Sequence, residues 1–194
     1  MKNIIYHFFG LIIFAGCSNN NEQFIVTETD STQVLFFPVT SFLKGQMLQF
    51  DSLQLTPLYI VTQQKKVDSS WVKKENMQAI LKDFISTEIN SSNLLKYFTA
   101  SKFNDQSTAA ITFTYTPKKT LPDSIPLRQW NVYITPETGQ VRKVYMVKQI
   151  KVNDSTYTQQ LTWETDKSAR ITTLQNMPDG KSGIIKDEKL IWKF

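Results

Sequence analysis

The chain has 194 residues, 41% of them hydrophobic, and a formal net charge of +5. This length and hydrophobic content are enough for one folded domain with a core of its own. Residues 18–194 contain neither cysteine nor histidine, because Cys17 and His7 are the only two. This excludes Ser-His-Asp and Cys-His catalysis, and zinc, haem or iron–sulfur sites built on those side chains, from that part of the chain. The lysines are dispersed rather than clustered, so we expect no nucleic-acid partner. We also expect no cofactor.

Residues 1–16 have the organisation of a secretory signal. Lys2 precedes an apolar run from Ile4 to Phe14, which is shorter than the roughly 20 residues of a membrane-spanning helix. Ala15-Gly16 stands directly before Cys17, and this stretch resembles the lipobox of bacterial lipoprotein precursors. The resemblance implies cleavage before Cys17, a diacylglyceryl thioether on its sulfur and an acylated amino terminus, for example with palmitate.

The residues after the cysteine predict where the protein resides. Ser18 stands where some bacteria use Asp for retention in the inner membrane, so the analogy favours the periplasmic side of the outer membrane. We expect residues 17–33 to be the lipidated cysteine with a tether, and residues 34–194 to be a single domain. A secreted chain with one cysteine forms no internal disulfide, so its fold depends on the core.

Two amphipathic helices are predicted in the first half of that domain. Each is indicated by apolar residues at three- and four-residue spacing, and Pro38 suits the first turn of the earlier one. The first set is Val39, Phe42, Leu43, Met47 and Phe50; the second is Met77, Ile80, Leu81, Phe84 and Ile85. Between them, residues 55–64 are typical of a strand, and residues 65–70 (KKVDSS) of a turn.

From about Ala109 the apolar period changes to two, which is typical of strands. The segment 130–148 (WNVYITPETGQVRKVYMVK) is similar to the Thr-Gly turned hairpin of PepSY-type envelope domains, and Gly139 suits its turn. Consecutive hairpins favour a meander. We therefore predict an α+β fold, in which two N-terminal amphipathic helices pack on one face of a C-terminal antiparallel meander of about six strands.

Three short motifs suggest an enzyme. Ser41-Phe42-Leu43-Lys44, Ser91-Ser92-Asn93 and Lys181-Ser182-Gly183 occur in the order found in penicillin-binding proteins and serine β-lactamases. That resemblance implies Ser41 as nucleophile and Lys44 as base. We reject it as the main interpretation, because each motif has few fixed letters and only eleven residues follow Gly183.

Carboxylates offer a second catalytic hypothesis. Asp83 and Glu88, or two of the three residues Glu137, Glu164 and Asp166, could act as a pair in glycoside hydrolysis. The alternative is that these carboxylates are solvated charges on helices and turns, and we favour this interpretation. Asp154 and Asp179-Gly180 could suggest calcium, but the D-x-[DN]-x-[DN]-G loop is absent, so no metal is expected.

The four tryptophans allow two interpretations. Trp71, Trp130, Trp163 and Trp192 could form the core between sheet and helices, or line a groove for an acyl chain, glycan or peptide. We favour the core.

Together these features predict a lipid-anchored envelope protein that binds or scaffolds and is not an enzyme. Its partners would be the membrane, through the lipid, and an envelope protein or hydrophobic ligand. The alternatives are a periplasmic carrier of an acyl-chain ligand, which requires an apolar cavity, and a small Ser/Lys or carboxylate hydrolase.

Overall fold

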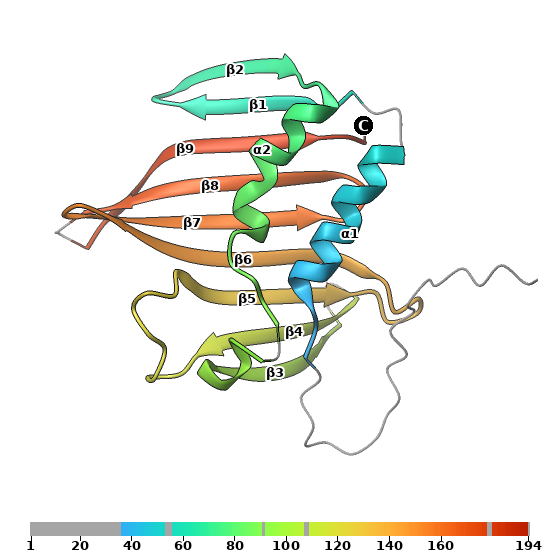
Figure 1. Cartoon of the computed structure of the whole chain (residues 1–194), viewed down its shortest axis with the longest axis vertical. Coiled ribbons are helices and arrows are strands. Elements are labelled where there is room, and N and C mark those ends of the chain that lie inside the picture. The colour runs from blue at the N-terminus through green and yellow to red at the C-terminus, as the bar shows by residue number, and fades with distance from the viewer. Residues whose placement is uncertain (1–35, 53–55, 91, 107–108, 178–179, 194) are drawn as a thin grey trace, which may run out of the picture.

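The computed structural model describes residues 36–52, 56–90, 92–106, 109–177 and 180–193. The signal, Cys17 and the tether lie outside these ranges, as do Ser91 and Asp179. The described residues form one antiparallel sheet in the order β2-β1-β9-β8-β7-β6-β5-β4-β3 (Figure 1). The strands are β1 (Leu58–Gln63), β2 (Lys66–Trp71), β3 (Phe98–Asp105), β4 (Ala110–Pro117), β5 (Leu127–Ile134), β6 (Val141–Val152), β7 (Ser155–Glu164), β8 (Ser168–Asn176) and β9 (Ser182–Ile191).

Helices α1 (Val39–Ser52) and α2 (Lys74–Ile85) form where the apolar spacing predicts them. Both cross the same face of the sheet (Figure 1). The core joins them at Trp163 on β7, whose ring stacks on Phe50 of α1 at 5.9 Å and meets Phe84 of α2 edge-on at 5.5 Å. The aromatic side chains therefore fix both helices to the centre of the sheet.

The predicted arrangement was wrong in its strands and in the position of its helices. The described sheet has nine strands rather than about six, and the β1–β2 hairpin lies between the two helices in the sequence. Residues 66–71 form an edge strand rather than a turn. A short 3-10 helix, η1 (Leu95–Tyr97), leads into β3, a second edge strand that was not predicted. Edge strands bury little apolar surface, so their sequences lack the alternation that reveals central strands.

The β1–β2 hairpin extends the sheet on the side of β9, which is the last of the described strands in the sequence. Leu58 of β1 lies opposite Ile191 of β9, and the two strands run antiparallel. The prediction of an antiparallel sheet is confirmed. Both helices cover one face, and no helix of the described residues covers the other, which we call the open face; one open face is common for antiparallel sheets.

Two β-bulges interrupt the register beside β5. At the end next to the β5–β6 turn, Tyr133 pairs with Lys143 and Ile134 with Val141, so Arg142 is an extra residue in β6. At the other end of the same strand pair, Arg128 is the extra residue in β5. A bulge rotates the local strand and redirects its side chains, and the Arg142 bulge shapes the site described next.

Candidate functional site

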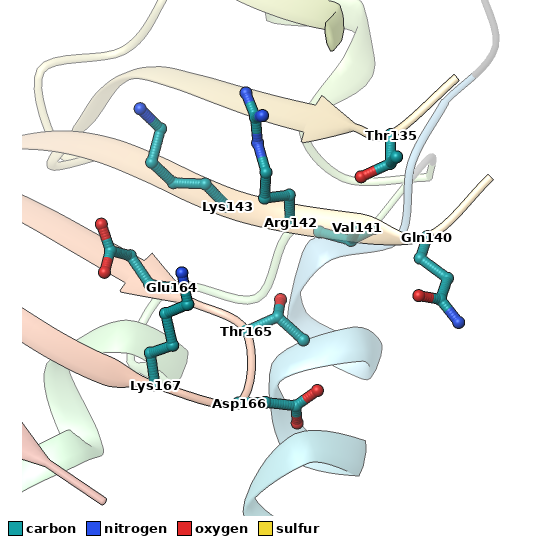
Figure 2. Close-up of a pocket in the computed structure, with 9 residues that line it drawn as sticks. All are labelled: Thr135, Gln140, Val141, Arg142, Lys143, Glu164, Thr165, Asp166 and Lys167. Carbon is teal, nitrogen blue, oxygen red and sulfur yellow. The ribbon is translucent and has the colours of Figure 1, made fainter. Parts of the chain in front are cut away.

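A pocket of about 370 Å³ lies at one end of the sheet, between the β5–β6 turn and the β7–β8 turn (Figure 2). We call it the turn pocket. Its lining is polar and charged, and consists of Thr135, Gln140, Val141, Arg142, Lys143, Glu164, Thr165, Asp166 and Lys167.

Short-range backbone hydrogen bonds hold the β5–β6 turn. The Gly139 N–H donates to the Thr135 carbonyl and the Thr135 N–H to the Gln140 carbonyl, both at 2.9 Å. Gly139 has a φ of 66°, a conformation that glycine adopts at little cost. The sequence Thr-Pro-Glu-Thr-Gly therefore closes a compact turn on one side of the pocket.

The β7–β8 turn is held against β6. Its Thr165 N–H donates to the Arg142 carbonyl at 3.0 Å, and its Lys167 N–H donates to the Glu164 carbonyl at 3.1 Å. Asp166 at the tip has a φ of 60°, which Asp tolerates better than most residues. Arg142 thus joins the two turns through its backbone as well as lining the pocket.

The bulge brings two cations to the same side of β6. Val141 and Val144 are both buried, and the extra residue between them leaves Arg142 and Lys143 to project together. Figure 2 shows their side chains leaving β6 side by side in the same direction. Regular alternation would have sent them to opposite faces.

The charges of the turn pocket sum to one excess positive charge: Arg142, Lys143 and Lys167 against Glu164 and Asp166. Glu164 lies directly opposite Lys143 in the β6–β7 ladder and accepts a hydrogen bond from Ser168 Oγ at 3.4 Å. In Figure 2 Lys167 runs back toward Glu164. A guanidinium and two ammonium groups around one hollow suit a carboxylate or phosphate group.

An aromatic and amide strip continues from the pocket along the open face. Lys143 Nζ lies 4.0 Å from the centre of the Tyr133 ring. Asn131 Nδ2 donates to the Tyr133 hydroxyl at 3.3 Å, and Gln129 Nε2 donates to Asn131 Oδ1 at 3.1 Å. Burial, together with the neighbouring Tyr133, raises the pKa of Tyr145. Tyr145 therefore stays a neutral hydrogen-bonding group at physiological pH.

The carboxylates singled out from the sequence do not gather in one place. Glu164 and Asp166 line the turn pocket, whereas Glu137 lies in the β5–β6 turn outside its lining. Figure 2 shows the Glu164 and Asp166 carboxylates pointing away from each other, with Thr165 and Lys167 between them, so they do not flank a common substrate position. Asp83 lies on α2, where its carboxylate accepts a hydrogen bond from Gln159 Nε2 at 3.3 Å.

The motifs resembling those of penicillin-binding proteins do not converge. Ser41 and Lys44 lie on α1, Ser92 lies between α2 and η1, and Lys181 lies just before β9. The start of β9 is at the opposite end of the strands from α1 (Figure 1). Ser92 Oγ instead donates to Asn90 Oδ1 at 2.7 Å, and Ser182 Oγ to Asn176 Oδ1 at 3.0 Å. These serines stabilise local turns.

Three of the four tryptophans belong to the core. Trp130, Trp163 and Trp192 are buried, and Trp130 stacks on Tyr115 at 4.4 Å. Trp71 is 63% exposed. The hollow between α2 and the sheet measures about 10 Å³, which is the space of about one water molecule.

Lys148 is the charged side chain that sequence reasoning missed. It lies on the helix-covered face of β6, is 2% exposed, and donates hydrogen bonds to the Asp83 carbonyl and to Ser86 Oγ (2.8 Å) at the end of α2. Burial lowers its pKa to about 8, an effect that the Asp83 carboxylate partly offsets. The available signal was its place in the alternating series Val144, Met146, Lys148.

Within the described ranges, no three His, Cys, Asp or Glu side chains are grouped closely enough to hold a metal ion, and no helix is long and apolar enough to cross a membrane. Asp154 is an exposed residue of the β6–β7 turn. Comparison of the chain with models of protein families, with curated proteins and with solved structures gave no match.

Proposed function

We propose that this is a lipid-anchored cell-envelope protein that acts by binding, and that the turn pocket recognises an anionic group on its ligand. The anchor is inferred from Ala15-Gly16-Cys17 and the apolar run before it. The observation that carries the recognition proposal is the bulge at Arg142, which directs Arg142 and Lys143 into one hollow that Lys167 also lines.

The chemistry of the pocket favours an anion over a cation or a neutral group. Arg presents a planar set of donors that matches carboxylate and phosphate oxygens, and each Lys adds a point charge. Glu164 lies opposite Lys143 in the β6–β7 ladder and competes with the ligand for these cations. We therefore expect the turn pocket to bind the anionic group of the ligand weakly. Further contacts with Gln129, Asn131 and Tyr133, the strip on the open face, would strengthen binding.

The acyl-carrier alternative has less support. Pockets for small molecules typically enclose about 300–1,000 Å³, whereas the hollow under the sheet measures about 10 Å³. The space between α2 and the sheet is filled by side chains such as Leu81, Phe84 and Ile171, all of them buried. The hydrolase alternatives lack a facing pair of carboxylates in the turn pocket, and the Ser41 and Lys44 pair lies on α1, outside its lining.

Titration of the full-length protein with inorganic phosphate, and separately with glutarate, tests the recognition proposal. Chemical shifts of backbone amides in the β5–β6 and β7–β8 turns should move with one saturating curve. The double variant Arg142→Gln/Lys167→Gln should weaken binding at least about tenfold, as expected on losing two charge-assisted contacts. The anion that binds more tightly identifies the ligand class.

The matched control removes two positive charges elsewhere. Lys102 and Lys151 are exposed lysines on β3 and on the far end of β6, and Lys102→Gln/Lys151→Gln should leave the binding constant unchanged. Equal weakening in both double variants would show that only the net charge matters and would refute the pocket as a recognition site.

A further inference from the structure

An apolar patch interrupts the open face at one corner of the sheet. Trp71, Leu58 and Ile191 lie opposite one another across β2, β1 and β9, and Ile60 is the next residue on the same face of β1. We call these four residues the Trp71 patch. Trp71 is 63% exposed although it is the largest side chain of the four.

The patch differs from the central strands of the open face. Away from this corner, the central strands present hydroxyl and amide side chains there, such as Thr114, Asn131 and Thr162. Such polar side chains are the usual covering of a solvated sheet face. Phe103 of β3 is also exposed on this face, at the opposite edge of the sheet, whereas the Trp71 patch groups four apolar residues at one corner.

Lysines surround the patch. Lys189 lies opposite Ile60 on the open face, Lys73 follows Trp71 by two residues, and Lys193 follows Ile191 by two; Lys73 and Lys193 are exposed. The nearest open-face carboxylate, Asp187, is held by Arg170 through Nε and Nη2 at 2.8 and 2.9 Å, and Glu75 lies in the first turn of α2. The surroundings of Trp71 are thus net positive.

We propose that the Trp71 patch is the surface by which the anchored protein rests on an anionic lipid bilayer. This inference depends on the proposed membrane attachment. Tryptophan has an apolar body and a polar N–H and is enriched at the membrane–water interface, while flanking lysines are attracted to anionic headgroups. Attachment nearby keeps the effective concentration of the bilayer high, so a small patch is sufficient.

The chain between Cys17 and the fold is long enough to permit this contact. The Phe36 ring lies 6.4 Å from the Tyr115 ring of β4, and β4 is seven strand spacings from β2, or about 34 Å at the usual spacing. Residues 18–35 could extend to at most about 60 Å. A lipid at Cys17 and the Trp71 patch can therefore lie in the same membrane surface.

Fluorescence quenching by brominated lipid tests the contact. The full chain is coupled through its single cysteine, Cys17, to a maleimide lipid in phosphatidylcholine vesicles that contain phosphatidylglycerol and brominated acyl chains. This coupling gives a reading whether or not cells lipidate Cys17. The wild type should lose the emission of Trp71, and Trp71→Phe should show no such loss because Trp130, Trp163 and Trp192 are buried.

Two comparisons make the result specific. Val67→Ser alters another exposed apolar residue of β2 and should leave the quenching intact, and vesicles without phosphatidylglycerol should reduce it. Equal emission of wild type on brominated and unbrominated vesicles would overturn the proposal. A dimer in solution that Trp71→Ser dissociates, with no quenching on vesicles, would instead assign the patch to a second copy of the chain.

Discussion

Replacement of the buried lysine, Lys148→Met, should change how the stability of the protein depends on pH. Met has a similar length and fills apolar space well, so the packing beneath α2 is retained. The substitution removes the ammonium that donates to the Asp83 carbonyl and to Ser86 Oγ. It also removes a charge that burial disfavours.

The size of the effect follows from the pKa. Burial lowers the pKa of Lys148 from 10.5 to about 8, so between these values the unfolded chain binds more protons than the folded one. The penalty for the buried charge is complete below pH 8 and disappears as the pH rises toward 10.5. Linkage therefore predicts that wild-type stability gains about 2 kcal/mol from this group between about pH 7 and pH 9.5.

Urea denaturation of wild type and Lys148→Met at the two pH values measures this gain. The difference in unfolding free energy between the proteins should move by about 2 kcal/mol in favour of the wild type as the pH rises. Lys151→Met, at an exposed lysine on the same strand, should leave the wild-type pH dependence unchanged. Tyr59 does not confuse this comparison. Burial and the hydrogen bond to Glu188 raise its pKa, so Tyr59 keeps its contribution to the unfolding free energy between these two pH values.

A constant difference between wild type and Lys148→Met across the pH range would refute the reasoning. It would mean that the ammonium is solvated in the folded protein, and that its contact with the end of α2 does not remove it from water.

Two further substitutions test how the fold is held. Thr40→Val should lower the unfolding free energy in urea denaturation by about 1–3 kcal/mol, because the buried Thr40 Oγ1 accepts a hydrogen bond from the Ile89 N–H at 2.8 Å. Thr40→Ser should recover most of that loss. An unchanged unfolding free energy in Thr40→Val would show that this contact is dispensable. Asp187→Asn should cost less than about 1 kcal/mol, because the Arg170 partner is largely exposed. Burial raises the pKa of Asp187, but hydrogen bonds from Arg170 and Thr172 outweigh this and hold the pKa below its usual value. The difference in unfolding free energy between wild type and Asp187→Asn should therefore vanish as the pH falls through that lowered pKa. A difference that persists there would contradict the ionic origin.

The sequence predicts those elements that bury a regular apolar pattern. Both helices and the long strand β6 (Val141–Val152) appear where spacing indicates them, because one buried face imposes a period on the residues. The edge strands β2 and β3 were missed for the opposite reason: a segment such as KVDSSW is exposed throughout, so no apolar alternation marks it.

The turn pocket could be predicted only in part. Glu164 and Asp166 were candidates as carboxylates, but the cations beside them depend on a bulge, which changes the direction of Arg142 without changing composition. A signal was present, since the buried Val141 and Val144 are three residues apart in a strand whose period is otherwise two. The approach of two turns that are separated in the sequence by strands β6 and β7 is a property of the sheet, and residue spacing alone does not reveal it.

The mass of the mature protein purified from the membrane tests the central claim most directly. Lipid attachment predicts a chain that begins at Cys17, which leaves 194 − 16 = 178 residues, and that carries the added mass of a diacylglyceryl group and one further acyl chain. Trypsin should release a single lipid-bearing peptide that starts with that residue. A protein with a free Cys17 thiol, or one cleaved at another bond, would contradict the account of a lipid-anchored binding protein.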